Sequence, residues 1–217
     1  MEEKLIHNKV TRLRGKIMII PVDQEKVMNE FKTKYVEKYF EEEYPKIQEK
    51  INKNKKILNE AIISKFQEVC SRAINMQEQA LKSEIKYIYI SYLRTSLMQN
   101  SGIYRIDLYD DKWFLDKEEC SVNIDLSVIY EPLFEHMQEL QETKKQYGRT
   151  ITEMDIEKIK VKEADKYHEI GIDILQGLAS DLVNCDEYKE MKKSEEISIF
   201  AGEYRDEAEI IYTSKHA

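Results

Sequence analysis

The sequence predicts an α+β protein, mainly α, with long antiparallel helices, a small antiparallel β-meander and a C-terminal β-hairpin. Three observations lead to this class. Apolar residues recur at spacings of three and four over most of the chain, which is typical of helices. Only 6 glycines and 3 prolines occur in 217 residues, so few turns interrupt these helices. Strict alternation of apolar and polar residues is found mainly in the middle of the chain, at 103–130, which predicts a small sheet there.

Length and composition predict a single elongated domain over residues 1–217. Charged residues make up 35% of the chain, against a globular norm of about 25%, and long thin helices supply the solvated surface that this excess needs. We expect the domain to divide into a helical region at 22–100, a β-meander at 103–130, a helical hairpin at 132–193 and a β-hairpin at 196–213.

The first elements are a short strand and a helix. Residues 17–20 form an apolar run that predicts a buried strand ending at Pro21, since proline has no N–H for the ladder. Asp23 is suited to cap the following helix through its side-chain oxygen. We expect that helix to end at Tyr44, because the residue before Pro45 disfavours helical angles.

The stretch from Lys46 to Asn100 contains no glycine or proline and predicts one long helix. Its apolar residues lie mainly three and four positions apart. The run Tyr87–Leu93 is apolar on several faces, so this part of the helix should be central and buried. Asn100 and Gly102 are typical of a helix C-terminus.

The period then changes to two, which predicts a three-stranded antiparallel meander. The expected strands are Tyr104–Leu108, Trp113–Leu115 and Cys120–Tyr130, joined by turns at Asp110–Asp111 and 116–119. The third strand has the strongest pattern, with six alternate apolar positions.

A helical hairpin should follow the meander. Pro132 suits the first position of its first helix, which Gly148 ends. Thr152 and Asp155 form a capping box for the second helix, which should run to about Lys193.

Two short strands should close the chain, and the long helices should pack on each other. Ile197–Phe200 and Ala208–Tyr212 predict a β-hairpin whose turn includes Gly202–Asp206. We expect the 46–100 helix to pack antiparallel against the 152–193 helix, because two long helices bury their apolar stripes most simply against each other.

The net charge of −8 argues against a general nucleic-acid binder, which needs Lys and Arg to neutralise phosphates. The charge is unevenly distributed. Residues 1–56 contain 14 Lys/Arg and 10 Asp/Glu, for +4, and the remainder contains 20 and 32, for −12. Such asymmetry can mark head-to-tail association or a polar partner surface, but uneven surface composition explains it more simply.

Cysteine spacing and hydropathy indicate a cytoplasmic protein. Cys70, Cys120 and Cys185 are far apart in sequence, which does not fit a disulfide framework or a zinc site. The N-terminus lacks the apolar core of a signal peptide. The run Ile85–Leu93 is too short to cross a bilayer, so we expect no membrane association.

The candidate metal ligands are three residues on one predicted helix face, Asp165, His168 and Glu169. A carboxylate three residues before a histidine occurs twice in carboxylate-bridged di-metal bundles, but only once here. Further ligands would have to come from Glu135 and His136 on the preceding helix. We expect no metal and no other cofactor, because an acidic chain produces one such pair by chance and burying unpaired carboxylates is costly.

The hairpin geometry can nevertheless bring the two helices together. If they fold back about the turn at 147–149, His136 lies opposite about Lys162 and Glu131 opposite about Tyr167. The candidate ligands of the two helices would then be near each other.

Two glycines interrupt the second helix of this hairpin. Gly171 and Gly177 each cost about 1 kcal/mol relative to alanine in a helix interior. Such glycines serve the close approach of a neighbouring element or a kink, or they open a ligand pocket. No phosphate loop, dinucleotide fingerprint or nucleophile elbow is present, and Asp107, Asp110 and Asp111 lack the spacing of an EF-hand.

These observations favour a non-enzymatic helical interaction protein, a scaffold or adaptor, whose partner is another protein or a second copy forming a homodimer. This interpretation rests on the long helices, the surface charge and the absence of catalytic motifs. The alternative is a ligand-binding protein or enzyme, possessing a pocket between the sheet and the 152–193 helix and using a metal if Asp165 and His168 bind one.

Overall fold

The computed structural model describes residues 10–13, 16–19 and 23–214. The helices are α1 (Gln24–Tyr35), α2 (Tyr39–Glu78), α3 (Arg94–Met98), α4 (Ser127–Thr143), α5 (Glu153–Asn184) and α6 (Asp186–Glu190), with 3₁₀ turns η1 (Trp113–Leu115) and η2 (Lys144–Tyr147). The strands are β1 (Val10–Leu13), β2 (Lys16–Ile19), β3 (Ile85–Tyr92), β4 (Ile103–Tyr109), β5 (Ser121–Asp125), β6 (Lys193–Glu203) and β7 (Ala208–Thr213).

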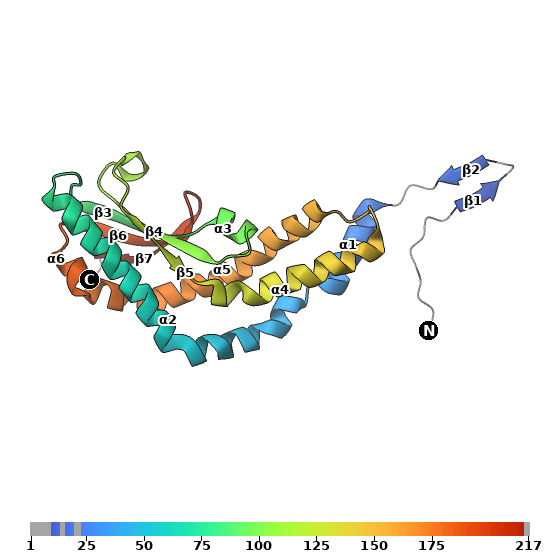
Figure 1. Cartoon of the computed structure of the whole chain (residues 1–217), viewed down its shortest axis with the longest axis horizontal. Helices are drawn as coiled ribbons and strands as arrows, with labels where there is room; N and C mark the ends of the chain where they lie inside the picture. The colour runs from blue at the N-terminus through green and yellow to red at the C-terminus, as the bar shows by residue number, and fades with distance from the viewer. Residues whose placement is uncertain (1–9, 14–15, 20–22, 215–217) are drawn as a thin grey trace.

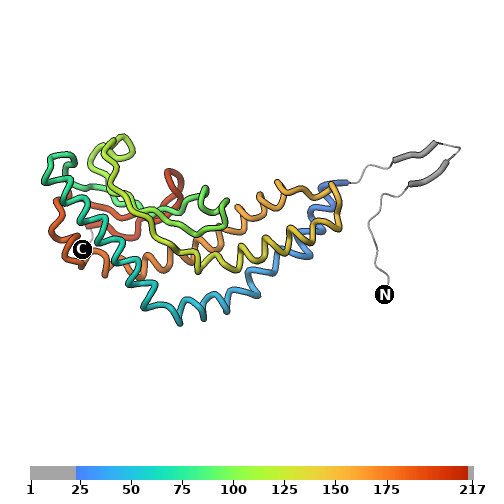
Figure 2. The backbone as a smooth tube through the Cα atoms, viewed as in Figure 1, coloured from blue at the N-terminus to red at the C-terminus, as the bar shows by residue number. Residues whose placement is uncertain are grey.

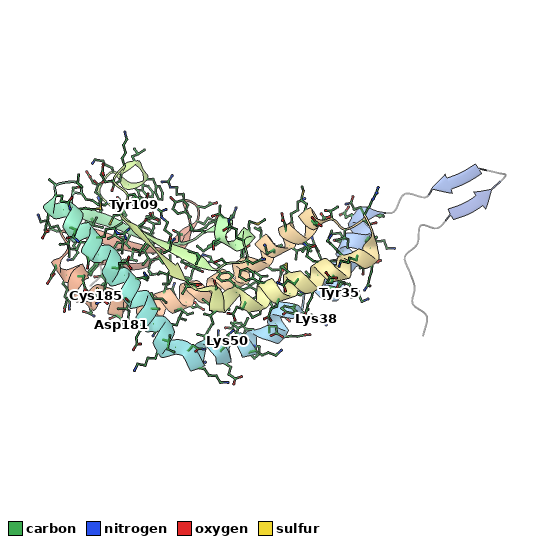
Figure 3. The ribbon with its side chains drawn as sticks, viewed as in Figure 1. Tyr35, Lys38, Lys50, Tyr109, Asp181 and Cys185 are labelled. Carbon is green, nitrogen blue, oxygen red and sulfur yellow. The ribbon has the colours of Figure 1, made fainter. Side chains whose placement is uncertain are left out.

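The main body has a sheet at one end and a helical arm at the other (Figure 1). The arm contains α1 and α4 together with the first halves of α2 and α5. Figure 2 shows α4 running opposite to its two long neighbours. Tyr35 lies in the arm and Tyr109 at the sheet (Figure 3). An ion pair between Lys50 and Glu131 joins α2 to α4 within the arm.

The sheet is mixed, with the strand order β5-β4-β3-β6-β7. All neighbours are antiparallel except β3 and β6, which run parallel with Ile88 opposite Ile199. The purely antiparallel meander was therefore wrong. β3 follows α2, and β6 follows α5 and the short α6. Because α2 and α5 run in the same direction, the strands that return from them are parallel.

Residues 85–92 form a strand, which corrects the single helix predicted over 46–100. α2 ends at Glu78, and Ala80 has a φ of 56°, so the helix stops without the glycine that usually marks such an end. The run from Tyr87 is rich in isoleucine and tyrosine, which favour strands. Its predicted burial is nevertheless confirmed, since β3 is the central strand and Ile88 and Ile90 are fully buried.

The meander differs from the prediction at its second and third strands. Trp113–Leu115 is a 3₁₀ turn rather than a strand, and β5 ends at Asp125 instead of Tyr130. Two residues after β5 the chain enters α4, because the apolar positions 126, 129, 130 and 133 also fit a helical spacing. β4 pairs antiparallel with both β3 and β5, so no strand lies between β4 and β5 and the third antiparallel strand is β3.

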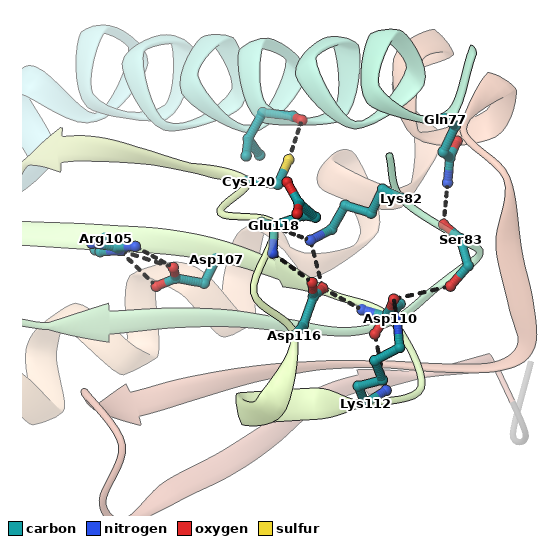
Figure 4. Close-up of polar contacts among 11 residues, drawn as sticks. Gln77, Lys82, Ser83, Arg105, Asp107, Asp110, Lys112, Asp116, Glu118 and Cys120 are labelled. Atoms are coloured by element: carbon teal, nitrogen blue, oxygen red, sulfur yellow. Dashed lines mark hydrogen bonds and ion pairs between the residues drawn. The ribbon is translucent and has the colours of Figure 1, made fainter. Parts of the chain in front are cut away.

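A buried polar cluster anchors the loop between β4 and β5 (Figure 4). The ammonium of Lys82 lies 2.6 Å from a carboxylate oxygen of Asp116 and donates to the carbonyl of Glu118. Both side chains of the ion pair are almost completely buried, at 0% and 3% exposure. A buried pair of this kind is costly to break from one side, so we interpret the cluster as structural.

Both helix-internal prolines contradict the prediction. Pro45 lies inside α2 and Pro132 inside α4, although they were expected to break one helix and begin another. The break between the first two helices instead falls at residues 36–38, and α4 begins at Ser127. Burial of apolar residues that follow each proline, including Ile47 and Leu133, stabilises the helix enough to retain the disfavoured geometry.

Several termini are confirmed. The Asp23 side chain accepts a hydrogen bond from the backbone N–H of Lys26, and Thr152 and Asp155 form the capping box of α5. Gly148, with a φ of 59°, ends the helical segment after α4. α5 itself stops at Asn184, earlier than expected, and α6 occupies part of the remainder.

The predicted C-terminal hairpin is also present, and the strand predicted near the N-terminus is paired in a second hairpin that the sequence did not indicate. β6 and β7 pair antiparallel, and β6 extends well beyond the predicted strand. β1 pairs with β2 over 10–19, which includes most of the strand predicted at 17–20, while Ile20 and Pro21 lie outside the described residues.

The helix packing combines one wrong prediction with one confirmed prediction. α2 and α5 contact each other in parallel, not antiparallel: the rings of Phe40 in α2 and Tyr167 in α5 are 5.0 Å apart. Further along, the ring of Phe66 in α2 lies 6.0 Å from that of Tyr188 in α6, the short helix that follows α5. α4 and α5 fold back antiparallel as expected, with the rings of Tyr130 and Tyr167 6.1 Å apart. α4 is therefore antiparallel to both long helices.

Candidate functional site

The candidate site is a groove of about 660 Å³ between α5 and the β6–β7 hairpin, which we call the hairpin groove. Its helix wall carries Asp165, His168 and Glu169, and the end of β3 contributes Tyr92. Further lining residues come from the start of α3, from α5, and from the two strands and their turn: Arg94, Ile172, Ala201, Gly202, Glu203, Asp206, Glu207, Ala208 and Glu209.

A chain of three hydrogen-bonded side chains lies beneath the groove. The hydroxyls of Tyr130 and Tyr104 are 2.8 Å apart, and the Tyr104 hydroxyl is 2.7 Å from Nδ1 of His168. Tyr104 is fully buried between the sheet and α5, and burial raises its pKa well above the usual value. These hydrogen bonds thus connect α4, β4 and α5, and His168 at their end lines the groove.

Hydrogen-bond bookkeeping assigns the proton positions in this chain. Tyr130 is buried, and its hydroxyl is hydrogen-bonded to that of Tyr104, with either oxygen able to donate. If Tyr130 donates to Tyr104, then Tyr104 donates to Nδ1 of His168, and Nε2 of His168 carries the ring proton. In the reverse direction, Nδ1–H of His168 donates to Tyr104 and Tyr104 donates to Tyr130, which leaves the hydroxyl proton of Tyr130 without an acceptor. We therefore assign Nε2 as an N–H donor.

That Nε2 atom is buried and has no hydrogen-bond partner among the described residues. Burial alone lowers the pKa of His168 to about 4, so the ring is neutral at neutral pH. The ring packs against Tyr92, with the two centroids 4.1 Å apart. A neutral donor without an acceptor is unusual in a protein interior and indicates a position that a bound group can complete.

Gly171 is required by the tyrosine of this chain. A Cβ atom at Gly171 would lie 2.4 Å from the hydroxyl oxygen of Tyr104. Tyr104 cannot move away easily, because its hydroxyl is held by Tyr130 and His168. Gly171 therefore serves the close approach of a side chain, which settles one alternative left by the sequence.

Gly177 has a different environment. A Cβ atom there would meet nothing within 4 Å. The residue lines a separate cavity of about 480 Å³ between α2 and α5, together with Ile51 and Leu58. Close packing therefore does not require a glycine at position 177.

The opposite wall of the groove is held by an ion pair. The guanidinium of Arg94 binds the carboxylate of Glu203 through two nitrogens, one of which lies 2.6 Å from an oxygen. The hydroxyl of Tyr92 lies 3.4 Å from the same carboxylate. These contacts tie the end of β3 and the start of α3 to the end of β6.

The groove is strongly acidic. Six of its lining residues are carboxylates and one, Arg94, is a cation, which gives 1 − 6 = −5 with His168 neutral. Arg94 is already paired with Glu203. Burial raises the pKa of Asp165, as expected where charges of one sign are crowded in a partly dehydrated site.

The remaining predicted site residues lie elsewhere. His136 is buried in the arm, where Nε2 lies 2.8 Å from the carbonyl of Tyr35 and the ring stacks on Tyr39 with centroids 3.6 Å apart. Glu135 is next to it on α4 and exposed. In residues 23–214, no three His, Cys, Asp or Glu side chains come together as a metal site would require.

Sequence reasoning found the helix wall of the groove and missed the rest. Asp165, His168 and Glu169 line one groove as their spacing predicted. Arg94 and Tyr92 were not identified because β3 was interpreted as a helix. The acidic residues of the β6–β7 turn were visible as charges, but no local pattern indicates that they face α5.

Comparison with family models, curated proteins and solved structures finds no match for this chain. The helices within the described ranges lack the combination of length and apolar character needed to cross a bilayer. The chemistry of the groove is therefore the basis for assigning a function.

Proposed function

We propose that the chain is a non-enzymatic interaction protein, an adaptor, whose hairpin groove binds a positively charged segment of a protein partner. The observation that carries this proposal is the net charge of −5 in a groove whose one cation is already paired. Like charges in close proximity repel, and a cationic segment would relieve that repulsion.

The aromatic wall supports the same partner chemistry. Tyr92 is mostly buried and lines the groove with the small exposed part of its side chain, beside the neutral ring of His168. A lysine or arginine side chain can place its aliphatic stem against such a wall while its charged end meets Glu207 and Glu209. Arginine is favoured for the carboxylate contacts because its planar guanidinium binds carboxylates through two nitrogens.

A binding measurement tests this function. We expect a fluorescent peptide of alternating lysine and glycine to bind the full chain, as followed by anisotropy, and to dissociate as salt is added. The double variant Glu207→Gln, Glu209→Gln should weaken binding about tenfold or more. The matched control Glu78→Gln, Glu84→Gln changes two exposed carboxylates outside the groove and should bind like the wild type. Equal binding by both variants would contradict the proposal.

A second candidate function is the binding of a small ligand, with or without catalysis, and the free Nε2–H of His168 favours it. If a local opening exposed the buried Nε2 atom, a zwitterionic amino acid could accept from it with its carboxylate and meet Asp165 with its ammonium group. We expect such a ligand, if bound, to shift the imidazole ¹⁵N resonances of His168. An unchanged spectrum in the presence of the common amino acids would exclude this class of ligand.

A further inference from the structure

The N-terminal part of the chain has the opposite charge to the hairpin groove. Between residues 4 and 22 the sequence contains five cations and no Asp or Glu: Lys4, Lys9, Arg12, Arg14 and Lys16. Within this stretch β1 and β2 pair antiparallel, with Leu13 opposite Lys16, and Arg14 and Gly15 connect them. Four of the five cations therefore lie in or directly beside a short two-stranded hairpin.

A two-stranded hairpin is marginally stable on its own in water and normally requires a further surface. The required surface should be acidic, since charge-assisted hydrogen bonds to carboxylates compensate the cations for the water that they lose on binding. The hairpin groove provides that surface: its lining residues carry a net charge of −5, whereas the whole chain of 217 residues carries −8.

We infer that the hairpin groove of one protomer binds the β1–β2 hairpin of a second copy of this chain. The inference rests on the proposed function, because it names the partner that supplies the cationic segment. Reciprocal exchange gives a closed dimer with two equal hairpin–groove contacts, in which each chain provides one hairpin and one groove.

Chain length favours a second copy over the chain's own hairpin. The chain enters α1 beside the start of α5, where the Gln24 side chain donates to the carbonyl of Thr150 at 3.4 Å. From Glu153 to Glu169 α5 rises about 24 Å. Three residues, 20–22, can span at most about 10 Å and the four residues of β2 about 13 Å, so chain length limits the reach of the hairpin tip to about 23 Å from Asp23.

The chain's own hairpin tip would therefore reach the helix wall of the groove only when fully extended. The acidic turn between β6 and β7, with Asp206, Glu207 and Glu209, forms the opposite wall. A second copy has no such restriction and can insert its hairpin between the two walls. A short connection before α1 also favours exchange between copies over folding back.

Charge reversal with rescue tests the inference. The hairpin variant is Arg12→Glu with Arg14→Glu, the groove variant is Glu207→Lys with Glu209→Lys, and a third protein combines all four changes. Light scattering at micromolar concentration and low salt should give twice 25.9 kDa for the wild type and 25.9 kDa for each double variant. The fourfold variant should regain the dimer because both charges are reversed. Glu78→Lys with Glu84→Lys should remain dimeric.

The possible outcomes separate the inference from the proposed function. A wild type of 25.9 kDa at every salt concentration would overturn the second-copy inference, while binding of the lysine–glycine peptide to the groove would still support the adaptor. If proteolysis at Arg12 and Arg14 of that monomer accelerated in the groove variant, the hairpin would belong to the groove of its own chain. A dimer unaffected by both double variants would place the interface elsewhere and also overturn the inference.

Discussion

His136 and His168 lie in two comparable regions of the α4–α5 pair, yet their hydrogen bonding differs. Both rings contact a tyrosine, and burial lowers the pKa of both. His136, in the helical arm, donates from Nε2 to the backbone carbonyl of Tyr35. His168, at the sheet end, has Tyr104 at Nδ1 and no partner at Nε2 among the described residues.

The difference teaches how a structural histidine can be distinguished from a candidate binding residue. In the buried ring of His136 the Nε2 donor already has a backbone carbonyl as its acceptor, so this atom leaves no contact for a ligand to supply. A buried ring with a free donor beside an acidic groove has an environment that a ligand can complete. Residue type and burial alone would not have separated the two regions.

The largest expected effect concerns the packing under the His168 region. Gly171→Ala should lower the free energy of unfolding by about 3 kcal/mol, because the new methyl group overlaps the Tyr104 hydroxyl and displaces it from its partners. Urea denaturation measures the change. Gly177→Ala is the matched control and should raise stability by about 1 kcal/mol, since its site is open. Equal effects at the two sites would show that Tyr104 repacks freely.

The second expected effect is a pH dependence that His168 dominates. Its pKa falls from 6.5 when unfolded to about 4 when folded, so folding favours the neutral ring. The stabilisation is present above pH 6.5 and is lost as the pH falls toward 4. Between pH 7 and pH 5 the wild type should lose about 2 kcal/mol more than His168→Gln in urea denaturation.

A matched variant sharpens this comparison of the two histidines. The pKa of His136 is also lowered by burial, so it contributes with the same sign. His136→Gln should retain most of the wild-type dependence on pH. If instead His136→Gln abolished it and His168→Gln did not, the assignment of the more deeply perturbed ring would be reversed.

The smallest expected effect is that of one hydroxyl. Tyr104→Phe should destabilise the protein by about 1–2 kcal/mol, because it leaves the Tyr130 hydroxyl and Nδ1 of His168 without partners. The control Tyr39→Phe removes a longer bond, of 3.3 Å, from the hydroxyl to the carbonyl of Pro132 in the arm. It should cost less than about 1 kcal/mol. Thermal unfolding monitored by circular dichroism compares the two.

Local chemistry in the sequence determined the elements that depend on neighbours in the chain. The capping box at Thr152, the cap at Asp23 and the end at Gly148 were predictable because a cap forms with residues at most three or four positions away. The common face of Asp165, His168 and Glu169 was predictable for the same reason, since helical spacing defines it.

Only the tertiary structure decided what the rest of the chain does. β3 is compatible with a helix or a strand by its apolar run, and pairing with β4 and β6 selected the strand. The meaning of Gly171 depends on Tyr104, 67 positions away in the sequence, whose hydroxyl occupies the space that a Cβ would need. The groove depends on bringing the β6–β7 turn against α5. Such contacts are decided by packing over long sequence separations, which local pattern and propensity do not encode.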